Sequence, residues 1–541
     1  MFAALDVIVV VVVSLSENDK VGATVVDLQR SCPTTSTTSC LLENLIDSYE
    51  DSLKLNDSQS MPALQVLVIQ NSALRRIPSS QLLDVMPNLE KLLLLNCGIN
   101  SLNEKDFSGI HRLKILALKE NSIFTLAKNV FQPLAGSLEE LQLRSNRIHI
   151  LNRQAFGGLQ NLNFLDISYN NVISLQGGVF EPLPNLEYLD LSHNNLEAID
   201  GNTFSKNPKL STLNLSDNKF SVYEPNSLAH FKHLKILDLS NSLLEDLYLQ
   251  SVDLLQISNS GLKTCTVNGG VLRLLAANNS LSGIKIGNKL EVLDIQLQGN
   301  YFEALDDFQG MVNLRSLDIS HNHVGGLISR KSSAIYLHLP NLEYLNLAHN
   351  RLRQLSANQF LMLSELRSLD LSHNQLLQLP TGVLRPLKGL RQLYLDNNHL
   401  VDFNCTQLKQ QHPALQQITL DGNDWEEQYQ GELILQLQQQ NITVRRHMPG
   451  YDMDNYLNSH EMPPPTPFEH YEKQQLIGSV SGIHPYWTLR DVLALITLLL
   501  VLIILLLQFF RILQEEQCCR RRFFQHDHEA EQPLVHNSSV L

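Results

Sequence analysis

The stretches NLEYLDLSHNNLEAID (Asn185–Asp200) and NLEYLNLAHNRLRQLS (Asn341–Ser356) are nearly identical, although they lie far apart in a chain of 541 residues. In both copies leucines follow the opening asparagine at the first, fourth and sixth positions, as Leu186, Leu189 and Leu191 do. Leu189 and Leu191 alternate with residues that we expect to point outward, and this pattern is typical of a short strand with one buried face. The stretch therefore predicts a strand that is buried only when copies of it lie side by side.

The same pattern runs through most of the chain. Written as L-x-x-L-x-L-x-x-N-x-L, it matches at about sixteen starts, namely Leu64, Leu89, Leu113, Leu138, Leu162, Leu186, Leu210, Leu234, Val252, Val271, Val292, Leu314, Leu342, Leu366, Leu390 and Leu415. The ninth position is often asparagine, which can hydrogen-bond the backbone groups that are freed where the chain leaves the strand. A later phenylalanine also recurs, at Phe107, Phe156, Phe180, Phe308 and Phe360, and we expect these rings to stack on the far side.

This pattern resembles the leucine-rich repeats of extracellular proteins from about residue 64 to 425. The resemblance implies an α/β solenoid with a curved parallel β-sheet on its concave face and an irregular, partly helical convex face. Between 234 and 313 the repeats shorten to 18–22 residues, too few for the phenylalanine segment. We therefore expect the curvature to change there; the short repeats represent either drift without consequence or a binding zone or hinge.

Both ends of such an array need a cap. Residues 17–63 are the predicted N-terminal cap, with Cys32 and Cys40 as a candidate disulfide. Residues 426–445 are the predicted helical C-terminal cap, with Asp424 as its N-cap and with Leu433, Leu435 and Leu437 covering the last repeat. Related caps usually place a cysteine soon after such a tryptophan, but glutamates follow Trp425 here, which favours a cap held by packing alone.

Two apolar runs predict the topology. Residues 492–510 carry no charge and are long enough to cross a bilayer, and Arg511 with Arg520 to Arg522 places the C-terminus inside. Residues 1–16 resemble a signal peptide, with an uncleaved anchor as the alternative. We predict a single-pass type I plasma-membrane protein with an extracellular N-terminus, a Pro-containing stalk at 446–491 and a short cytoplasmic tail at 511–541.

The tail is too short for a signalling domain, so it can act only by recruiting partners. Cys518 and Cys519 are candidate palmitoylation sites, and Ser539 with Leu541 matches the simplest ligand pattern of PDZ domains. The formal net charge of −14 argues against a nucleic-acid partner. No catalytic or cofactor motif is present in the sequence, so we predict neither an enzyme nor a bound cofactor.

Several outward positions are candidate binding residues. The third and fifth positions give a candidate ligand face consisting of Phe164, Asp166, Tyr188, Asp190, Asp238, Asp318, Tyr344 and Asp370. The eighth position repeats a histidine at His193, His321, His349 and His373; this row is either a metal or pH-sensing site or only the frequent L-S-H-N of such repeats. N-x-S/T glycosylation acceptors lie at Asn56, Asn214, Asn278, Asn404 and Asn441.

The other three cysteines differ in their place in the repeat pattern. Cys97 and Cys265 fall at core positions, whereas Cys405 lies outside the pattern and is either a free thiol or an intermolecular bridge. Together these features predict a cell-surface receptor or adhesion protein, acting in development or innate immunity, whose ectodomain binds a protein or glycoconjugate. A homodimer or a co-receptor complex is compatible with this interpretation. The alternative is a structural accessory subunit that modulates another membrane protein.

Overall fold

We analysed a computed structural model of the chain, which describes residues 9–10, 25–26, 38–43, 54–55, 61–77, 86–221, 228, 231, 234–329, 336–380 and 382–445. Several predicted features lie outside these residues: Cys32, Asn56, the stalk, the apolar run 492–510, and the tail with Cys518, Cys519, Ser539 and Leu541. Most of the predicted signal peptide also lies outside. Within the described residues, no helix is both long and apolar enough for a membrane span.

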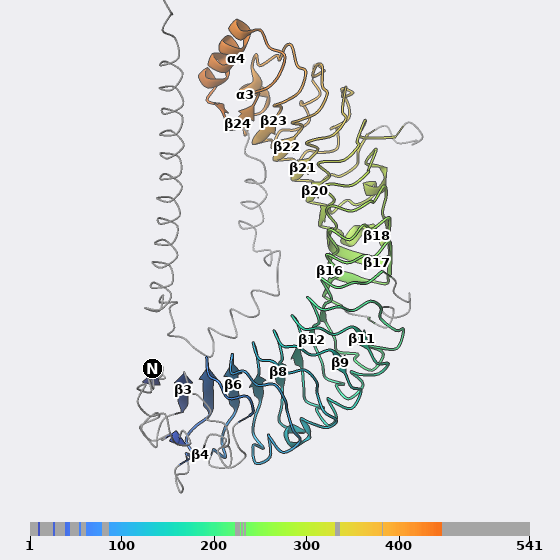
Figure 1. Ribbon diagram of the computed structural model, residues 1–541. Coiled ribbons are helices and arrows are strands. Elements are labelled where there is room, and N and C mark those ends of the chain that lie inside the picture. The colour runs from blue at the N-terminus through green and yellow to red at the C-terminus, as the bar shows by residue number, and fades with distance from the viewer. Residues whose placement is uncertain are drawn as a thin grey trace, which may run out of the picture. The chain divides into compact units, whose positions relative to one another are not determined.

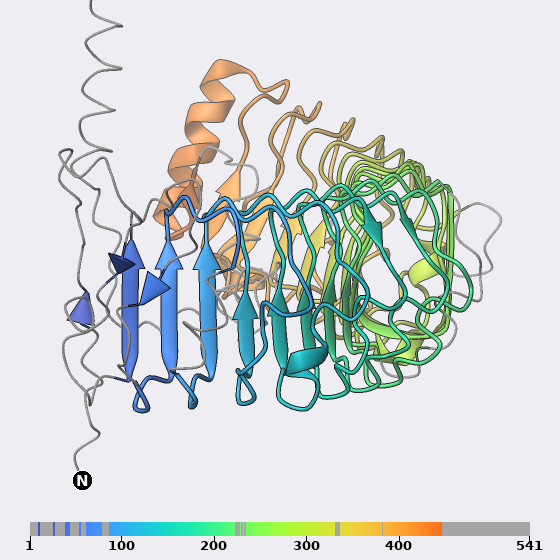
Figure 2. The same cartoon turned by 60° about the horizontal axis from the view of Figure 1, so that its bottom comes forward.

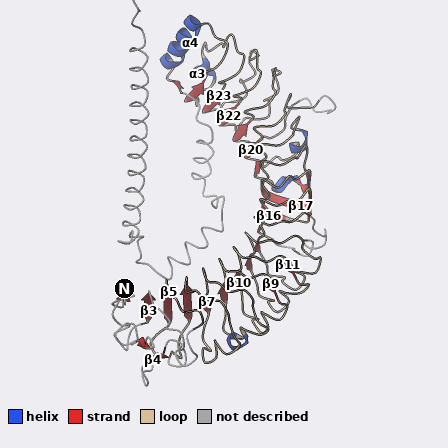
Figure 3. Ribbon diagram, in the orientation of Figure 1, coloured by secondary structure: helices blue, strands red, loops and turns tan. Residues whose placement is uncertain are grey.

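The repeats form one parallel β-sheet that follows the inner side of an arc, as Figures 1 and 3 show. In spatial order its strands are β1 (Val9–Val10), β3 (Ser39–Glu43), β5 (Val66–Gln70), β6 (Lys91–Leu95), β7 (Ile115–Ala117), β8 (Glu140–Gln142), β10 (Phe164–Asp166), β12 (Tyr188–Asp190), β13 (Thr212–Asn214), β14 (Ile236–Asp238), β16 (Val252–Gln256), β17 (Thr264–Leu275), β19 (Asp294–Gln296), β20 (Ser316–Asp318), β21 (Tyr344–Asn346), β22 (Ser368–Asp370), β23 (Gln392–Tyr394), β24 (Gln417–Thr419) and β25 (Thr443–Val444). Equivalent repeat positions pair directly, since Leu165 lies opposite Leu189 and Leu189 opposite Leu213.

The remaining elements are short. They are the strand pairs β2 (Val25–Val26) with β4 (Lys54–Leu55) and β9 (Ile150–Leu151) with β11 (Ser174–Leu175), the 3₁₀ helices η1 (Gln132–Leu134), η2 (Lys289–Glu291) and η3 (Asp306–Phe308), and the helices α3 (Leu408–Gln411) and α4 (Glu427–Gln439). Figure 2 shows the first strands of the array side by side with all their arrows in one direction. The predicted parallel solenoid is confirmed, and it contains few helices.

The core repeats in every coil. Leu186, Leu189 and Leu191 are fully buried, and the convex phenylalanines predicted from the sequence are buried as well. The Phe180 ring centroid lies 6.2 Å from that of Phe156 and 5.8 Å from that of Phe204. This ring spacing exceeds the roughly 4.8 Å between strands. The wider spacing on the outer side is what bends the array.

The ninth-position asparagines join consecutive coils. The Asn194 Oδ1 accepts from the backbone N–H of Val172 at 3.0 Å, and its Nδ2 donates to the carbonyls of Ile167 and Leu191, both at 3.0 Å. Two of these three partners belong to the preceding coil. Four coils carry another residue at this position, namely Ser72, Cys97, Ser242 and Ser260. The Cys97 thiol donates to the Ile69 carbonyl at 3.2 Å. The asparagines therefore link most coils to the preceding one, as their chemistry predicts.

The middle of the array, residues 234–313, has a second sheet. Here β15 (Asp246–Leu249), the first part of β17 and β18 (Lys285–Asn288) pair in parallel on the side opposite the main sheet. The shortened repeats replace the phenylalanine segment by a strand, so both faces of the coil have strand spacing. Cys265 is buried in this second sheet, as expected from its repeat position. Figure 1 shows this green segment between two curved arms, which we call the N-terminal arm (residues 64–221) and the C-terminal arm (residues 314–425).

The C-terminal cap differs from its prediction in two details. Helix α4 buries Leu433 and Leu437 against the last coils, but Leu435 is 59% exposed and covers nothing. The N-cap residue is Glu426 and not the predicted Asp424, and Glu426 makes no side-chain capping bond. The Asp424 carboxylate instead lies 3.1 Å from His399 Nδ1. Strand β25 then extends the sheet by one strand. The cap is thus formed by packing and by strand pairing.

Candidate ligand-binding surface

The candidate ligand face lies on the concave sheet in two parallel rows. Phe164 and Tyr188 are paired neighbours in the third-position row, and their rings stack with centroids 4.2 Å apart and planes 5° apart. Tyr344 occupies the same row in the C-terminal arm. It is separated from Tyr188 along the row by Thr212, Ile236, Leu254, Arg273, Asp294 and Ser316. The structure therefore brings two of the three aromatic residues together and leaves the third in the other arm.

The eight predicted face residues are much less accessible than the sequence suggests, since each is only 4–8% exposed. The five aspartates act within the fold: Oδ1 of Asp166, Asp190 and Asp370 accepts from the backbone N–H two residues later, at 2.8–2.9 Å. Asp238 and Asp318 make the same bond. These carboxyls hold the turn that follows each strand. Strand spacing packs each of these side chains between its two neighbours, so the row is nearly closed on the concave sheet and its role as a ligand face stays a prediction.

Burial also changes the charge of the five aspartates. It raises the pKa of Asp370 to about 7 and that of Asp238 to about 6. Burial raises the pKa of Asp190 to about 7, and repulsion from Asp166 adds to the effect. The pKa values of Asp166 and Asp318 are also raised by burial. At neutral pH the concave face is consequently less negative than its count of aspartates implies.

The rim beside the sheet offers more accessible groups. Each eighth-position residue that is not glycine has a positive φ, between 50° and 58°, which turns its side chain outward at the end of the strand. His321, His349 and His373 stack there with ring centroids 4.0 and 3.9 Å apart, so three of the four eighth-position histidines form a continuous row. Rings stacked face to face do not converge on one point. No group of three His, Cys, Asp or Glu in the described part of the chain could hold a metal ion.

A second stack on the rim was missed in the sequence. Tyr169, 42% exposed, stacks on His193 with centroids 3.9 Å apart. The guanidinium of Arg144 lies 4.4 Å from the Tyr169 ring centroid, and His193 Nε2 lies 3.5 Å from a carboxylate oxygen of Asp217. We call Arg144, Tyr169, His193 and Asp217 the rim stack. Aligning the eighth position of every repeat reveals Tyr169 beside the histidines, whereas Arg144 occupies the seventh position and only the fold brings it onto the ring.

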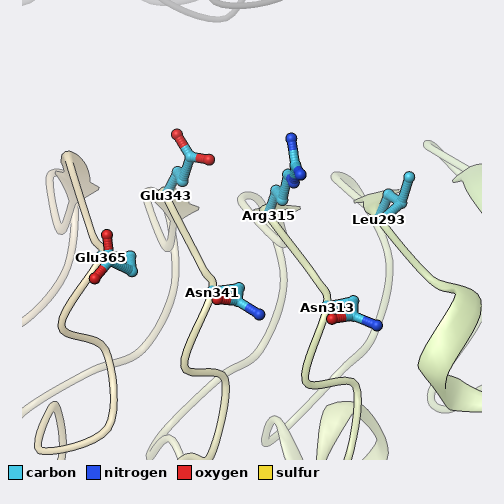
Figure 4. Close-up of a pocket in the computed structure, with 6 residues that line it drawn as sticks. All are labelled: Leu293, Asn313, Arg315, Asn341, Glu343 and Glu365. Carbon is cyan, nitrogen blue, oxygen red and sulfur yellow. The ribbon is translucent and has the colours of Figure 1, made fainter.

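At the opposite edge, where strands begin, a shallow polar hollow of about 320 Å³ spans four coils. Figure 4 shows Arg315 and Glu343 projecting on the same side from neighbouring coils. Below them Asn313 and Asn341 donate to carbonyls of the preceding coils at 2.8 and 2.9 Å, while Glu343 pairs with Arg367 at 2.8 Å. These contacts occupy the amide groups of Asn313 and Asn341 and the carboxylate of Glu343. The hollow is thus mainly a consequence of coil-to-coil bonding.

The glycosylation acceptors have different surroundings. Asn278, Asn404 and Asn441 are exposed. Asn214 is only 5% exposed on the concave sheet, where its Nδ2 donates to Asp190 at 3.2 Å and its Oδ1 accepts from the Ser216 hydroxyl at 2.9 Å. A glycan on that nitrogen would need space that this nearly buried side chain does not have, so the surroundings of Asn214 disfavour its modification.

The cysteines also separate clearly. Cys40 is disulfide-bonded, but its predicted partner Cys32 lies outside the described residues, so the pairing stays a prediction. Cys405 is 3% exposed, and its thiol donates to Gln436 Oε1 of α4 at 3.0 Å. Its burial favours the free-thiol interpretation over an intermolecular bridge, since a partner chain could reach it only after α4 moves.

Comparisons with known proteins agree with this geometry. The leucine rich repeat model matches residues 136–196, 184–244 and 340–400, and a second leucine rich repeat model matches residues 311–327. The protein is thus a leucine-rich-repeat solenoid protein. No curated protein sequence matches the chain.

Two solved structures illustrate the likeness. A leucine-rich-repeat protein of Leptospira interrogans is 25% identical, with a TM-score of 0.55, and the match covers 71% of this chain and 91% of that one. The Drosophila Toll–Spatzle complex contains a chain that is 22% identical, with a TM-score of 0.52, over 71% of this chain and 51% of that one. At this identity the second match supports the fold alone.

Proposed function

We propose that this protein is a cell-surface receptor or adhesion protein whose repeat array binds a protein or glycoconjugate ligand along its rim and concave face. The observation that carries the proposal is the rim stack. It places an aromatic ring, a guanidinium and an imidazole at the accessible border of a sheet whose own predicted face residues are almost fully buried. Rigid aromatic residues beside an arginine are the groups that dominate binding energy in protein interfaces. Leucine-rich-repeat arrays are typically interaction scaffolds, which supports binding rather than catalysis.

The comparison with the Toll–Spatzle complex is consistent with such a role. That complex is described as a hub in Drosophila development and innate immunity. We extend to this chain only the use of a repeat array to hold a protein ligand. The type I plasma-membrane topology, cleavage of residues 1–16, the glycans, palmitoylation of Cys518 and Cys519, and PDZ binding through Ser539 and Leu541 belong to the same proposal.

The first test concerns location. A full-length chain tagged just before the first repeat is expressed in cells and stained with antibody before and after permeabilisation. Staining of intact cells is expected, because both the tag and the array precede the apolar run 492–510. Staining that appears only after permeabilisation would overturn the topology. Deleting residues 38–445 should abolish the cellular activity of the protein, because the array that binds the ligand is then missing. If the stalk, the apolar run and the tail alone retain that activity, the accessory-subunit interpretation replaces the receptor interpretation.

The second test concerns the binding surface. Surface-restricted proximity labelling identifies neighbours of the full-length chain, and direct binding of a recovered partner is then measured. Tyr169→Ala should weaken binding by roughly tenfold or more, as expected for a central aromatic contact. Tyr301→Ala is the matched control, because Tyr301 is 50% exposed and also contacts a histidine ring, but lies in the middle segment. Equal effects of the two changes would argue against the rim stack as the contact site.

A further inference from the structure

Exposed apolar side chains gather on one lateral face of the N-terminal arm. Phe124, Ile150 and Ile173 are 45%, 58% and 50% exposed, and they come from three consecutive coils. Two exposed charged residues accompany them: Arg147 lies on the coil of Ile150, and Glu197 lies on the coil that follows Ile173. We call these five residues the lateral patch. They follow the ninth-position asparagines of their coils, at outward positions that the sheet and the convex core do not use.

The backbone holds the coils of the lateral patch in register. The N–H of a tenth-position residue donates to a carbonyl of the preceding coil, as Arg147 does to Ile123 at 3.0 Å and Asn195 does to Val172 at 2.9 Å. Strands β9 and β11 add a short parallel pairing on the same face. A surface that is ordered before binding loses little conformational entropy when a partner docks on it.

The lateral patch carries one cation and one anion, on opposite sides of Ile173. The guanidinium of Arg147 lies 5.7 Å from the Phe124 ring centroid, beside the apolar group. Neither Arg147 nor Glu197 forms an ion pair with another residue in the part of the chain that the structure describes. Both charges are therefore available to a partner that covers the apolar side chains between them.

The fold does not require apolar residues on this face. The positions equivalent to Phe124 are polar in most other coils, for example Asn100, Glu303 and Arg353. Leu377 and Val401 are exceptions in the C-terminal arm, where they are 62% and 61% exposed. A contiguous group of exposed apolar side chains that the fold does not need is typical of a protein interface.

A second copy of this chain has the chemistry that the lateral patch requires. A two-fold axis reverses the order of the coils between two contacting copies. When the axis passes between Asn171 and Ile173, the coil of Arg147 in one copy lies opposite the coil of Glu197 in the other. These two residues occupy the tenth and twelfth positions of their coils, so opposite charges meet at two symmetry-related places. The two Ile173 side chains then pack near the axis.

Only one axis through the three apolar coils gives this match. An axis through the coil of Ile150 brings the Arg147 side chains of the two copies close together, and like charges repel. An axis through the coil of Phe124 places Arg147 opposite Asn100, which has no charge. The axis beside Ile173 also places Phe124 opposite the exposed Lys219 of the other copy, whose ammonium can lie over the ring.

We propose that the lateral patch is the contact surface of a two-fold symmetric homodimer of this chain. Arg147 of each copy pairs with Glu197 of the other, and the apolar side chains between them are covered. The contact is limited to a few coils, which fits a reversible dimer rather than an obligate one. The inference goes beyond the proposed function, because it concerns how two copies meet and requires no ligand.

The first test is cysteine crosslinking of the full-length chain, purified in detergent. Ile173→Cys places two thiols near the axis, so a short bismaleimide should join two copies. Leu377→Cys is the matched control, because Leu377 has the same repeat position and is more exposed. We expect Ile173→Cys to give roughly fivefold more covalent dimer than Leu377→Cys or the unmodified chain, with both linked residues identified by mass spectrometry. Equal amounts of dimer, or crosslinks to another protein, overturn the proposal.

Exchange of the two charges tests the register of the dimer. In the Ile173→Cys chain, Arg147→Glu and Glu197→Arg each bring like charges together in a dimer of identical copies, so each should reduce the crosslink by roughly fivefold. A mixture of the two variants, carrying different tags, opposes unlike charges at both places and should restore the crosslink between the tags. Misfolding cannot explain a contact that the same two variants lose alone and regain together. No loss in the single variants, or no recovery in the mixture, overturns the proposal.

Discussion

Asp370 gives the sharpest test of the buried aspartate row. Its Oδ1 accepts from the backbone N–H of Ser372 at 2.9 Å, and burial, with repulsion from Asp396 and Asp318 as further causes, raises its pKa to about 7. Asn346 lies beside it in the sheet and makes the equivalent bond to the N–H of Ala348, also at 2.9 Å. Asp370→Asn therefore keeps the turn-forming acceptor and removes only the charge.

The direction of the effect follows from the two pKa values. The folded-state pKa of about 7 is above the ordinary value of 3.8. The folded state therefore holds the proton more tightly, and the stability that this provides is complete below pH 3.8 and is lost as the pH rises to about 7. A shift of this size corresponds to at most about 4 kcal/mol, at 1.36 kcal/mol per pH unit. Relaxation and water entry reduce such penalties, so we expect Asp370→Asn to stabilise the array by about 1–3 kcal/mol at pH 8.

Urea unfolding of residues 17–445 followed by tryptophan fluorescence measures this change. Trp425 is the one tryptophan in that span, and it reports on the C-terminal arm. The substitution also creates an N-x-S acceptor, so the protein should be produced in a bacterial periplasm, where cysteines oxidise and asparagines are not glycosylated. Asp402→Asn, at an exposed aspartate of the same arm, is the control.

The pH dependence decides the outcome. The stability difference between Asp370→Asn and the unmodified protein should grow by about 1–2 kcal/mol from pH 5 to pH 8, while the control stays within about 0.5 kcal/mol. A variant that is less stable than the unmodified protein at pH 8 would refute the reasoning. A difference that is the same at both pH values would refute it equally, because it could not come from the carboxyl group.

Three further predictions concern the stacking of coils and the C-terminal cap. Asn350→Ala removes an acceptor for Val324 N–H and a donor to Ile319, so unfolding should cost about 2–4 kcal/mol less; Asn341→Ala, which loses one exposed bond, is the comparison, and equal effects would contradict the role of the ninth position. Phe180→Ala should destabilise by about 3–5 kcal/mol because the ring is fully buried between two others, whereas Leu361→Ala, at an exposed convex site, should change the urea midpoint little. The Cys405 thiol should resist alkylation at pH 8 until denaturant detaches α4, because burial both raises its pKa and blocks access; rapid labelling of the native protein, seen by mass spectrometry, would show that α4 does not cover it.

A feature of this protein could be predicted from the sequence when the interactions behind it act within one coil. Leu186 and Asn194 could be assigned from the sequence because their roles repeat in most coils, and one coil suffices to define which side chains point inward. Phe180 was assigned for the same reason. Stacking equivalent coils then fixes the register of the whole sheet, since Leu189 can be buried only opposite Leu165 and Leu213.

The sequence by itself thus determined the solenoid, its core and its asparagine rows, because these depend on a period that is visible along the chain. Only the tertiary structure decided which outward side chains are accessible. Asp190 and Tyr188 point outward from their strand, yet their neighbours in adjacent coils, at strand spacing, enclose them. Phe124 and Ile150 have polar equivalents in other coils and are 45% and 58% exposed, because no side chain of the described residues encloses them. Accessibility depends on contacts between coils, which a repeat pattern read one coil at a time does not contain.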